Sequence, residues 1–180
     1  VTPFDAALPG SLPAVNARAV ELAARLGFAL GAHVQSRSSF DRKHYRYPDL
    51  PHGYQITQQR SPIALGGSLD VFVDKKAVGG VGGADDGSKR RTLRVERLQL
   101  EMDTGTSSVA SDGATTVDLN RAGSTLVEIV TAPDLRGAEE AASAAETFQR
   151  VVRFLGVGDA NMEEGSMRVD VNAVSYTHLT

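Results

Sequence analysis

The segment from Ala138 to Leu155 has the clearest helical periodicity in this sequence, and it limits the folds that the chain can adopt. Its apolar residues recur on one face of a helix: Ala141, Ala145, Phe148, Val152 and Leu155. Acidic residues lead the segment, Arg150 and Arg153 come late and Gly156 follows, as expected at the two ends of a helix. We therefore predict an amphipathic helix that packs one face against other elements.

The remaining periodicity predicts one more helix and several strands. The second helix is predicted from about Ala14 to Leu30, with Gly31 as its stop. Strands are predicted at 68–73, 91–103 and 124–130. Residues 38–65 are polar and aromatic without helical periodicity, so we interpret them as a structured loop, and the Gly/Asp-rich residues 79–91 as a flexible linker.

A last strand is predicted near the end of the chain, in the stretch NMEEGSMRVDVN at 161–172. Gly165 would let the chain turn into this strand. Met167, Val169 and Val171 then alternate with Arg168, Asp170 and Asn172, which share the opposite face. That polar face either meets water or lines a cleft, and periodicity leaves both possibilities open. The element order is typical of an α+β fold with a mixed or antiparallel sheet and flanking helices.

Composition excludes several classes of protein. The net charge of −3 over 180 residues gives no overall basic character, so contact with nucleic acid would need a local patch or a partner protein. The absence of cysteine excludes disulfides, thiolate metal sites and a cysteine nucleophile. The four histidines lack the close spacing of a zinc motif. No apolar run approaches the ~20 residues that span a bilayer, so we expect no membrane partner.

Three groups of carboxylates are candidates for chemistry. Glu101 and Asp103 are two residues apart, hence on one face of a strand. Glu128 shares a strand face with apolar residues, where a carboxylate is costly to bury unless it meets a cation. The third group is Glu163, Glu164 and Asp170, with Arg168 between them. Hard oxygen ligands without soft ones suit Mg²⁺, which takes one or two carboxylates plus substrate phosphates.

Each group also has a purely structural interpretation. The pairs Glu101/Asp103 and Glu163/Glu164 are each typical of solvated surfaces, because acidic residues are mostly exposed. Glu128 fits a functional role as well as a structural one. The basic cluster at 42–44 is of a kind that is usually only solvated, but the tyrosines around it also fit a surface for phosphate or RNA.

Several of these stretches together resemble a known family. FDRKHYRYPDLPHGYQITQQ (40–59), LEMDTG (100–105), VDLNRAGSTLVEIVTAPD (117–134) and NMEEGSMRVDVN (161–172) are similar to the B subunits of aspartyl/glutamyl-tRNA amidotransferases. LPGSLPAVN (8–16) fits the same family. The motifs occur in the family's order from about Phe4 to Val174, which makes the resemblance far more specific than any single glycine pattern.

The resemblance implies a catalytic cradle with a glutamine-synthetase-like α+β fold. It implies that ATP and Mg²⁺ are used to phosphorylate the side-chain carboxylate of glutamate esterified to the glutamine tRNA. Ammonia from glutamine, released by the amidase (A) subunit, then displaces phosphate to give glutaminyl-tRNA, and a small C subunit braces the pair. In the family a helical region and a tRNA-binding tail follow the cradle.

The resemblance also implies roles for single residues. Phosphoryl transfer needs metal-bridged phosphate oxygens and a positioned acceptor, held away from competing water. The implied catalytic residues are Glu128, Arg168 and Lys43. The implied metal ligands are Glu101, Asp103, Glu128, Glu163, Glu164 and Asp170. The implied cofactor-binding residues are Arg42, Tyr54, Arg121 and Asn172. Arg168 would neutralise charge on the transferred phosphoryl group, while Lys43 and Arg42 would meet phosphate or the tRNA end.

The sequence departs from the bacterial family pattern at 98–103. That pattern is usually Leu-His-x-Glu-Glu-Asp, whereas this chain has Gln99 and Met102 at the histidine and second glutamate positions. Gln99, with FDAALPG, FDRKHY and ITQQR, resembles the mitochondrial branch, so we expect the mitochondrial matrix, with bacterial cytoplasm as the alternative. From the resemblance we expect the family's first strand, with its Glu-x-His metal-site residues, to precede Val1. We expect residues 1–174 to be a truncated catalytic domain, inactive alone, and 175–180 a non-native or frayed tail.

Two other functions remain open at this point. The first is a scaffold without catalysis that binds tRNA or a partner protein, and Met102 is the feature that favours it. The second is an unrelated Mg²⁺-dependent carboxylate–amine ligase that acts on a free small molecule and needs no tRNA. Glutamyl- and aspartyl-tRNA specificity are both compatible with the sequence.

Overall fold

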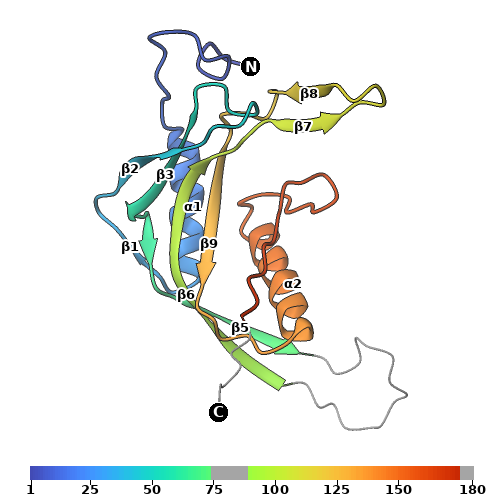
Figure 1. Ribbon diagram of the computed structural model, residues 1–180. Coiled ribbons are helices and arrows are strands. Elements are labelled where there is room, and N and C mark those ends of the chain that lie inside the picture. The colour runs from blue at the N-terminus through green and yellow to red at the C-terminus, as the bar shows by residue number, and fades with distance from the viewer. Residues whose placement is uncertain (74–88, 175–180) are drawn as a thin grey trace, which may run out of the picture. The chain divides into compact units, whose positions relative to one another are not determined.

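The computed structural model describes residues 1–73 and 89–174 (Figure 1). These residues fall into two compact units. Unit 1 consists of Val1–Leu69 and Arg94–Ala132, and unit 2 of the described residues within Asp70–Leu93 and Pro133–Thr180. Most of the predicted linker 79–91 and the whole predicted tail 175–180 lie outside the described residues. Residues 89–91 belong to a strand instead.

The elements confirm a mixed α/β fold with antiparallel sheets and two helices. The helices are α1 (Ala17–Ala29) and α2 (Ala138–Phe154). The strands are β1 (His33–Val34), β2 (Ser39–His44), β3 (Tyr54–Ser61), β4 (Ala64–Leu65), β5 (Ser68–Val73), β6 (Lys89–Met102), β7 (Thr106–Val109), β8 (Thr115–Asp118) and β9 (Thr125–Thr131). Within the described residues, neither helix has the length and apolar composition that a bilayer requires.

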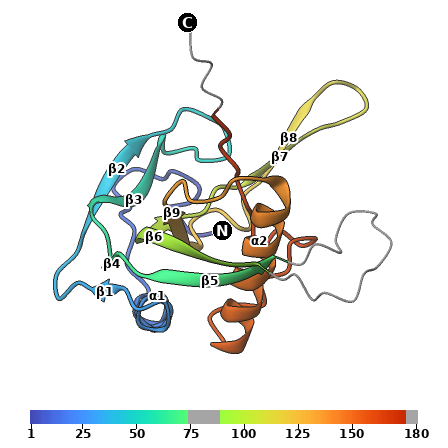
Figure 2. The same cartoon turned by 90° about the horizontal axis from the view of Figure 1, so that it is seen from below.

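The long strand β6 organises the main sheet, because it pairs with β4, β5 and β9. In unit 1, α1 packs against β1, β4 and β9, and Figure 2 shows it beside β1 and β4. Ala23 and Leu26 are buried on its inner face. The helix starts after Asn16, whose side-chain oxygen accepts the backbone N–H of Arg18, a standard N-cap. The predicted helix and the three predicted strands are therefore confirmed, with ends shifted by a few residues.

A register shift in β6 decides which side chains face the core. Val95 pairs with Thr131, but Arg97 already pairs with Val130, so one residue of β6 is extra at this point. Such a bulge re-aims the side chains that follow it. Beyond it the even-numbered residues Leu98, Leu100 and Met102 are buried. The odd-numbered residues 97, 99 and 101 consequently share the other face of the sheet.

The prediction of a loop over residues 38–65 is wrong, because β2 and β3 form an antiparallel hairpin there. Its buried side chains are polar: Gln55, Thr57 and Gln58. Two of them form hydrogen bonds with backbone groups of β6, in the part of this strand that β4 does not reach. Gln55 Nε2 donates to the carbonyl of Met102 (2.8 Å), and Gln58 Oε1 accepts from the N–H of Leu100 (3.0 Å). A strand with a polar buried side lacks the apolar alternation on which the sequence prediction relied.

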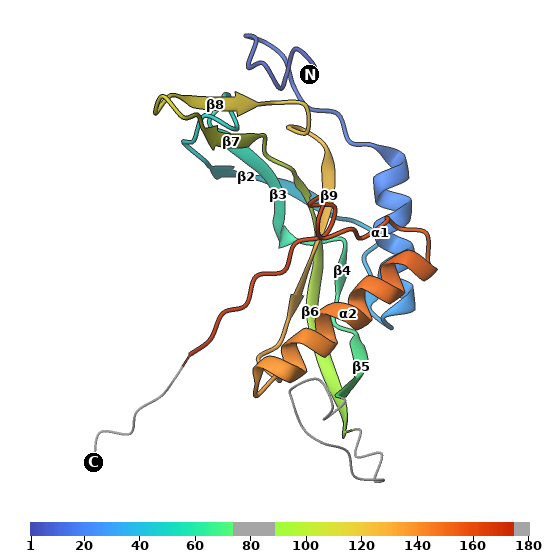
Figure 3. The same cartoon turned by 90° about the vertical axis from the view of Figure 1, so that its right-hand side faces the viewer.

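The remaining segments of unit 1 lie at the C-terminal end of β6. Phe4, Leu50 and Met102 form a buried cluster, against which Tyr45, Tyr54 and Ile56 pack. The β7–β8 ribbon follows directly after β6, as Figure 3 shows. Its strands are exposed along their whole length.

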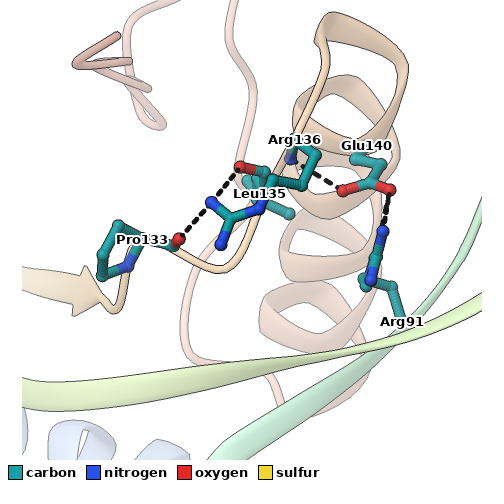
Figure 4. Close-up of polar contacts among 5 residues, drawn as sticks. All are labelled: Arg91, Pro133, Leu135, Arg136 and Glu140. Atoms are coloured by element: carbon teal, nitrogen blue, oxygen red, sulfur yellow. Dashed lines mark hydrogen bonds and ion pairs between the residues drawn. The ribbon is translucent and has the colours of Figure 1, made fainter. Parts of the chain in front are cut away.

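In unit 2, the first turn of α2 is held by Glu140 (Figure 4). Its Oε2 accepts the backbone N–H of Arg136 (2.8 Å), the residue before the N-cap Gly137, which has no side chain to cap the helix. Its Oε1 accepts two hydrogen bonds from Arg91 on β6 (2.8 and 3.1 Å). Arg136 Nη1 in turn donates to the carbonyl of Pro133 (2.9 Å).

The other end of α2 holds the chain that follows it. Arg153 Nε donates to the carbonyl of Asp159 (2.6 Å), and Gln149 Nε2 to that of Ala160 (2.8 Å). The predicted helix at 138–155 is thereby confirmed, with Phe148 buried on its apolar face. The late arginine, expected from the helix dipole, binds the carbonyls of the next loop.

The strand predicted at 167–172 is wrong. Residues 162–165 form a turn, which Ser166 N closes by donating to Asn161 O, and Gly165 has the predicted turn-forming role with φ +72°. Residues 167–174 follow without strand pairing to any described residue. On the side predicted to be apolar, Val169 and Val171 are exposed. Alternation alone does not make a strand where no neighbouring strand supplies backbone hydrogen bonds.

Candidate functional site

Five polar side chains meet in unit 1 on the face of β6 and β9 that does not point to the core. We call them the polar cluster: Thr57, Arg97, Gln99, Glu101 and Glu128. Three of them follow one another along β6 at every second position, and Glu128 of β9 is the cross-strand partner of Gln99. The bulge before Arg97 is what turns this row away from the core.

Gln99 lies at the centre of the polar cluster and is buried. Its Nε2 donates to Glu101 Oε1 (2.9 Å) and to Glu128 Oε2 (2.8 Å). Its Oε1 accepts a hydrogen bond from Arg97 Nε (2.8 Å). One amide group therefore links the two carboxylates to each other and to an arginine.

Glu101 is also bound from the neighbouring hairpin. The hydroxyl of Thr57, on β3, donates to the same Oε1 at 2.5 Å. Thr57 is buried, so this contact fixes the carboxylate at the junction between the hairpin and the main sheet. Glu101 thus has a defined orientation rather than the freedom of a solvated side chain.

The protein disfavours ionisation of Glu128. Its side chain reaches the surface, but its carboxyl group lies against Gln99 and Glu101. Loss of hydration there raises the pKa of Glu128, and the nearby charge of Glu101 raises it further. The hydrogen bond from Gln99 acts in the opposite direction. A carboxyl pair of this kind gains most from a proton or a cation placed between its members.

The carboxylates of Glu101 and Glu128 are chemically suitable as two of the ligands of a divalent cation. Carboxylate oxygens are the ligands that Mg²⁺ prefers, and a site for it commonly uses one or two of them. Glu101 Oε2 and Glu128 Oε1 accept no hydrogen bond from a nitrogen or hydroxyl of the described residues. Among these residues, no three acids or histidines are grouped to hold a metal ion.

Asp103, the third acid predicted here, lies beyond the end of β6 and has other partners. Its Oδ2 forms an ion pair with Arg121 Nε (3.1 Å), and its Oδ1 accepts the backbone N–H of Thr104. The structure therefore brings together Asp103 and Arg121, which the resemblance had given separate roles in binding metal and cofactor. Both assignments stay predictions.

The basic residues predicted on the hairpin lie on its two faces. Arg42 stacks over the ring of Tyr54, with its guanidinium carbon 5.6 Å from the ring centre, so two predicted cofactor-binding residues are in contact. Lys43 pairs across the hairpin with Gln55, and therefore shares a face with Thr57. Lys43 is exposed and forms no ion pair with a described residue.

The other predicted site residues belong to unit 2. They follow α2 in the turn and the extended segment after it: Glu163, Glu164, Arg168, Asp170 and Asn172. All five are exposed. The backbone N–H of Glu163 donates to Asn161 Oδ1 (3.2 Å), which fixes the start of the turn. Their assembly with Glu101 and Glu128 into one site stays a prediction.

The sequence prediction missed the residues that join the two carboxylates. Arg97 and Gln99 alternate with Glu101, so the same period of two that grouped Glu101 with Asp103 would have included them. In the sequence, Gln99 signals only the branch of the family, because it departs from the bacterial pattern and resembles the mitochondrial one. Thr57 gave no usable signal, because its strand was interpreted as a loop.

The family is established by comparison with known proteins. Residues 1–178 match the GatB/GatE catalytic domain. The chain is 84% identical over 177 residues to the chloroplastic/mitochondrial glutamyl-tRNA(Gln) amidotransferase B-2 subunit of Micromonas commoda, which covers 98% of this chain and 31% of that protein. It is 47% identical over 181 residues to the human mitochondrial glutamyl-tRNA(Gln) amidotransferase B subunit, covering 97% of this chain and 30% of that protein.

A bacterial relative is similar at nearly the same level. The aspartyl/glutamyl-tRNA(Asn/Gln) amidotransferase B subunit of Treponema pallidum is 46% identical over 172 residues, covering 96% of this chain and 32% of that protein. The chain thus spans about a third of the length of these relatives. The match over 178 of 180 residues confirms the resemblance seen in the motifs, and the chain belongs to the GatB/GatE catalytic domain family.

Proposed function

We propose that this chain is part of the B subunit of a glutamyl-tRNA(Gln) amidotransferase. The reaction is the ATP-dependent phosphorylation of the glutamate side chain on mischarged tRNA, followed by its amidation with ammonia. The observation that carries the proposal is the pairing of Glu101 with Glu128 through Gln99, in a chain whose relatives are named as amidotransferase B subunits. The glutamine-synthetase-like cradle implied by the resemblance belongs to this proposal.

Glu101 and Glu128 would hold Mg²⁺ through the carboxylate oxygens that Gln99 and Thr57 leave open. When bound, Mg²⁺ would supply positive charge that offsets the negative charge on the phosphates of ATP. Gln99 and Thr57 hold the two carboxylates in a fixed orientation, so the pair would attract a cation to this face of the sheet.

The basic residues would bind the anionic partners of the reaction. Lys43 is an exposed cation on the hairpin face that also carries Thr57, where it can meet a phosphate group. Arg42, stacked on Tyr54, has a guanidinium that is preoriented for phosphate or for the tRNA end. Arg168 would neutralise charge on the transferred phosphoryl group, and Arg121 and Asn172 would contact the nucleotide. The metal-binding roles that the resemblance implies for Asp103, Glu163, Glu164 and Asp170 remain part of the proposal.

The partners and the compartment follow from the family. The amidase (A) subunit would supply ammonia, the small C subunit would brace the complex, and mischarged Glu-tRNA(Gln) would be the substrate. The relatives from Micromonas commoda and human are named as chloroplastic/mitochondrial and mitochondrial, whereas the Treponema pallidum relative is bacterial. We propose an organelle as the compartment, the mitochondrial matrix in particular, since the eukaryotic relatives share this naming.

A scaffold without catalysis is the second candidate, and Met102 was the feature that favoured it. In the structure Met102 is buried in the cluster with Phe4 and Leu50, on the core side of β6. Its side chain is therefore on the opposite face of the strand from Glu101. The departure at this position leaves the Glu101–Glu128 pair intact, which supports the catalytic proposal over the scaffold.

ATP consumption by the reconstituted full-length complex tests the proposal. With glutamine, ATP and Glu-tRNA(Gln), one ATP should be hydrolysed for each glutaminyl-tRNA formed, and omission of the mischarged tRNA should abolish this hydrolysis. Tight tRNA binding without ATP consumption would support the scaffold. Amide formation on free glutamate, without tRNA, would show that the chain belongs to a small-molecule ligase instead.

A further inference from the structure

Gln99 uses every hydrogen-bonding group of its side chain within the polar cluster. A carboxamide has two N–H donors and one carbonyl oxygen that accepts. The two distances from Nε2 are 2.8 and 2.9 Å, each to a different carboxylate, and the third bond, from Arg97 Nε to Oε1, is 2.8 Å. Gln99 is 5% exposed, so water does not compete strongly for these groups.

Arg97 decides which way the amide of Gln99 points. Its Nε–H can only donate, so it must face the carbonyl oxygen of Gln99 and not the NH₂ group. The NH₂ group is thereby directed at Glu101 and Glu128. If the amide were turned over, its oxygen would face two carboxylates and its NH₂ would face an arginine donor, which leaves every one of these contacts repulsive.

The arrangement brings two carboxylates together without neutralising them. An arginine at position 99 would bind both acids as an ion pair, and a carboxylate there would repel them. A neutral amide donates a hydrogen bond to one oxygen of each carboxylate and adds no charge of its own. The remaining oxygens, Glu101 Oε2 and Glu128 Oε1, accept no hydrogen bond from a described nitrogen or hydroxyl.

From this geometry we propose that Gln99 is a positioning residue for a divalent cation. Its amide, oriented by Arg97, holds the carboxylates of Glu101 and Glu128 next to each other so that the two groups bind the ion together. The inference rests on the proposed function for its biological meaning, but the cation affinity that it predicts can be measured independently. Partners that orient metal ligands typically contribute 10–100-fold to metal affinity.

The test is a titration of the full-length complex with Mn²⁺, a paramagnetic substitute for Mg²⁺, followed by electron paramagnetic resonance. Gln99→Met keeps the length of the side chain but removes both donors, and should weaken Mn²⁺ binding about tenfold or more. Gln99→His keeps one N–H donor and should lose less. Gln59→Met, an exposed glutamine on β3, is the matched control and should bind like the wild type.

Two further readouts separate positioning from a structural role. The Mg²⁺ concentration that gives half-maximal amidation should rise in Gln99→Met, while the glutaminase activity of the amidase partner is unchanged. In the wild-type protein, the side-chain NH₂ resonances of Gln99 should exchange slowly with water and shift when Mg²⁺ is added. This measurement needs no variant, so the proposal stays testable even where Gln99→Met does not fold.

The possible outcomes distinguish this inference from the proposed function. Unchanged Mn²⁺ affinity in folded Gln99→Met, or Gln99 resonances that do not respond to Mg²⁺, would overturn the positioning role even in a complex that uses ATP normally. Weakened Mn²⁺ binding in a complex that consumes no ATP would support the positioning role and contradict the proposed reaction. A wild-type complex that binds no Mn²⁺ would overturn the inference.

Discussion

The backbone N–H of Leu100 donates a 3.0 Å hydrogen bond to the side-chain oxygen of Gln58, across two sheets that share no strand. Both residues are fully buried. Leu100 lies on β6 beyond the reach of β4, where its N–H would otherwise have no backbone partner on this edge. The adjacent residue of the same hairpin, Thr57, donates to Glu101. Two neighbouring residues therefore connect the hairpin to β6, one through the backbone of that strand and the other through the polar cluster.

The first prediction concerns this edge of β6. Gln58→Met should leave the N–H of Leu100 buried without an acceptor, at a cost of about 1–3 kcal/mol in unfolding free energy. Hydrogen exchange at the Leu100 amide should accelerate accordingly, measured by NMR on the purified protein. Gln59→Met, at the exposed neighbouring position, should have no such effect. Equal exchange in the two variants would contradict this account of the edge.

The second prediction concerns the acid stability of α2. Hydrogen bonds from Arg91 and then from the backbone of Arg136 hold the pKa of Glu140 below its usual value. A lowered folded-state pKa contributes stability above the unfolded-state pKa, and this contribution is lost as pH falls through the folded value. Glu140→Gln should therefore unfold at a lower temperature than the wild type near pH 7, with the gap closing towards roughly pH 3.

Glu139→Gln is the matched control for this prediction, since Glu139 is the exposed neighbour on the same turn. It should show little difference from the wild type at either pH. A gap for Glu140→Gln that stays constant between the two pH values would mean that packing, and not the charge of Glu140, holds the start of α2.

The third prediction has the opposite sign and concerns Glu128. Loss of hydration, and then the charge of Glu101, raise the pKa of Glu128, so the folded protein retains this proton to higher pH than the unfolded chain. Above the raised pKa, folding must place an ionised carboxylate beside another. Glu128→Gln should therefore stabilise the metal-free protein, with a gain in melting temperature that grows from about pH 4 to about pH 8.

Thermal unfolding in the presence of a chelator checks this prediction, because a bound cation would itself stabilise the wild type. Glu146→Gln, an exposed glutamate on α2, serves as the control. A lower melting temperature of Glu128→Gln at every pH would show that Glu128 is a net stabilising residue rather than one retained for function.

The fourth prediction concerns the exposed cation of the hairpin. Lys43→Gln should weaken binding of Glu-tRNA(Gln) to the full-length complex, and should reduce the slope of log affinity against log salt by about 1 if Lys43 contacts a phosphate. Arg18→Gln on α1, where Arg18 already pairs with Glu21, is the control for a general loss of positive charge. An unchanged slope for Lys43→Gln would remove Lys43 from the tRNA or phosphate surface.

The helices and central strands could be predicted because their buried sides are apolar. Phe148 in α2 and Leu26 in α1 each belong to a series of apolar residues at helical spacing. The strand predicted at 68–73 has the same bounds as β5. The hairpin at 39–61 was missed because Gln55, Thr57 and Gln58 fill its buried side, and polar residues carry no apolar period. These residues hydrogen-bond to β6, which is distant in sequence, so local sequence does not reveal their role.

The candidate site could be predicted only in part. Glu101 and Glu128 were both named from the sequence, and the structure brings them together. Gln99 can join them because the register of β6 with β9 places Gln99 opposite Glu128. This register depends in turn on the bulge near Glu96. A one-residue shift of register reverses the faces of a strand, and local sequence does not determine where such a shift falls.

The central claim is that acids of this chain take part in ATP-dependent amidation, and Glu128→Ala in the reconstituted full-length complex tests it most directly. Glutaminyl-tRNA formation and ATP hydrolysis should fall to background, while the amidase partner still releases ammonia from glutamine at its normal rate. Normal amidation by this variant, in a complex that assembles as the wild type does, would contradict the account.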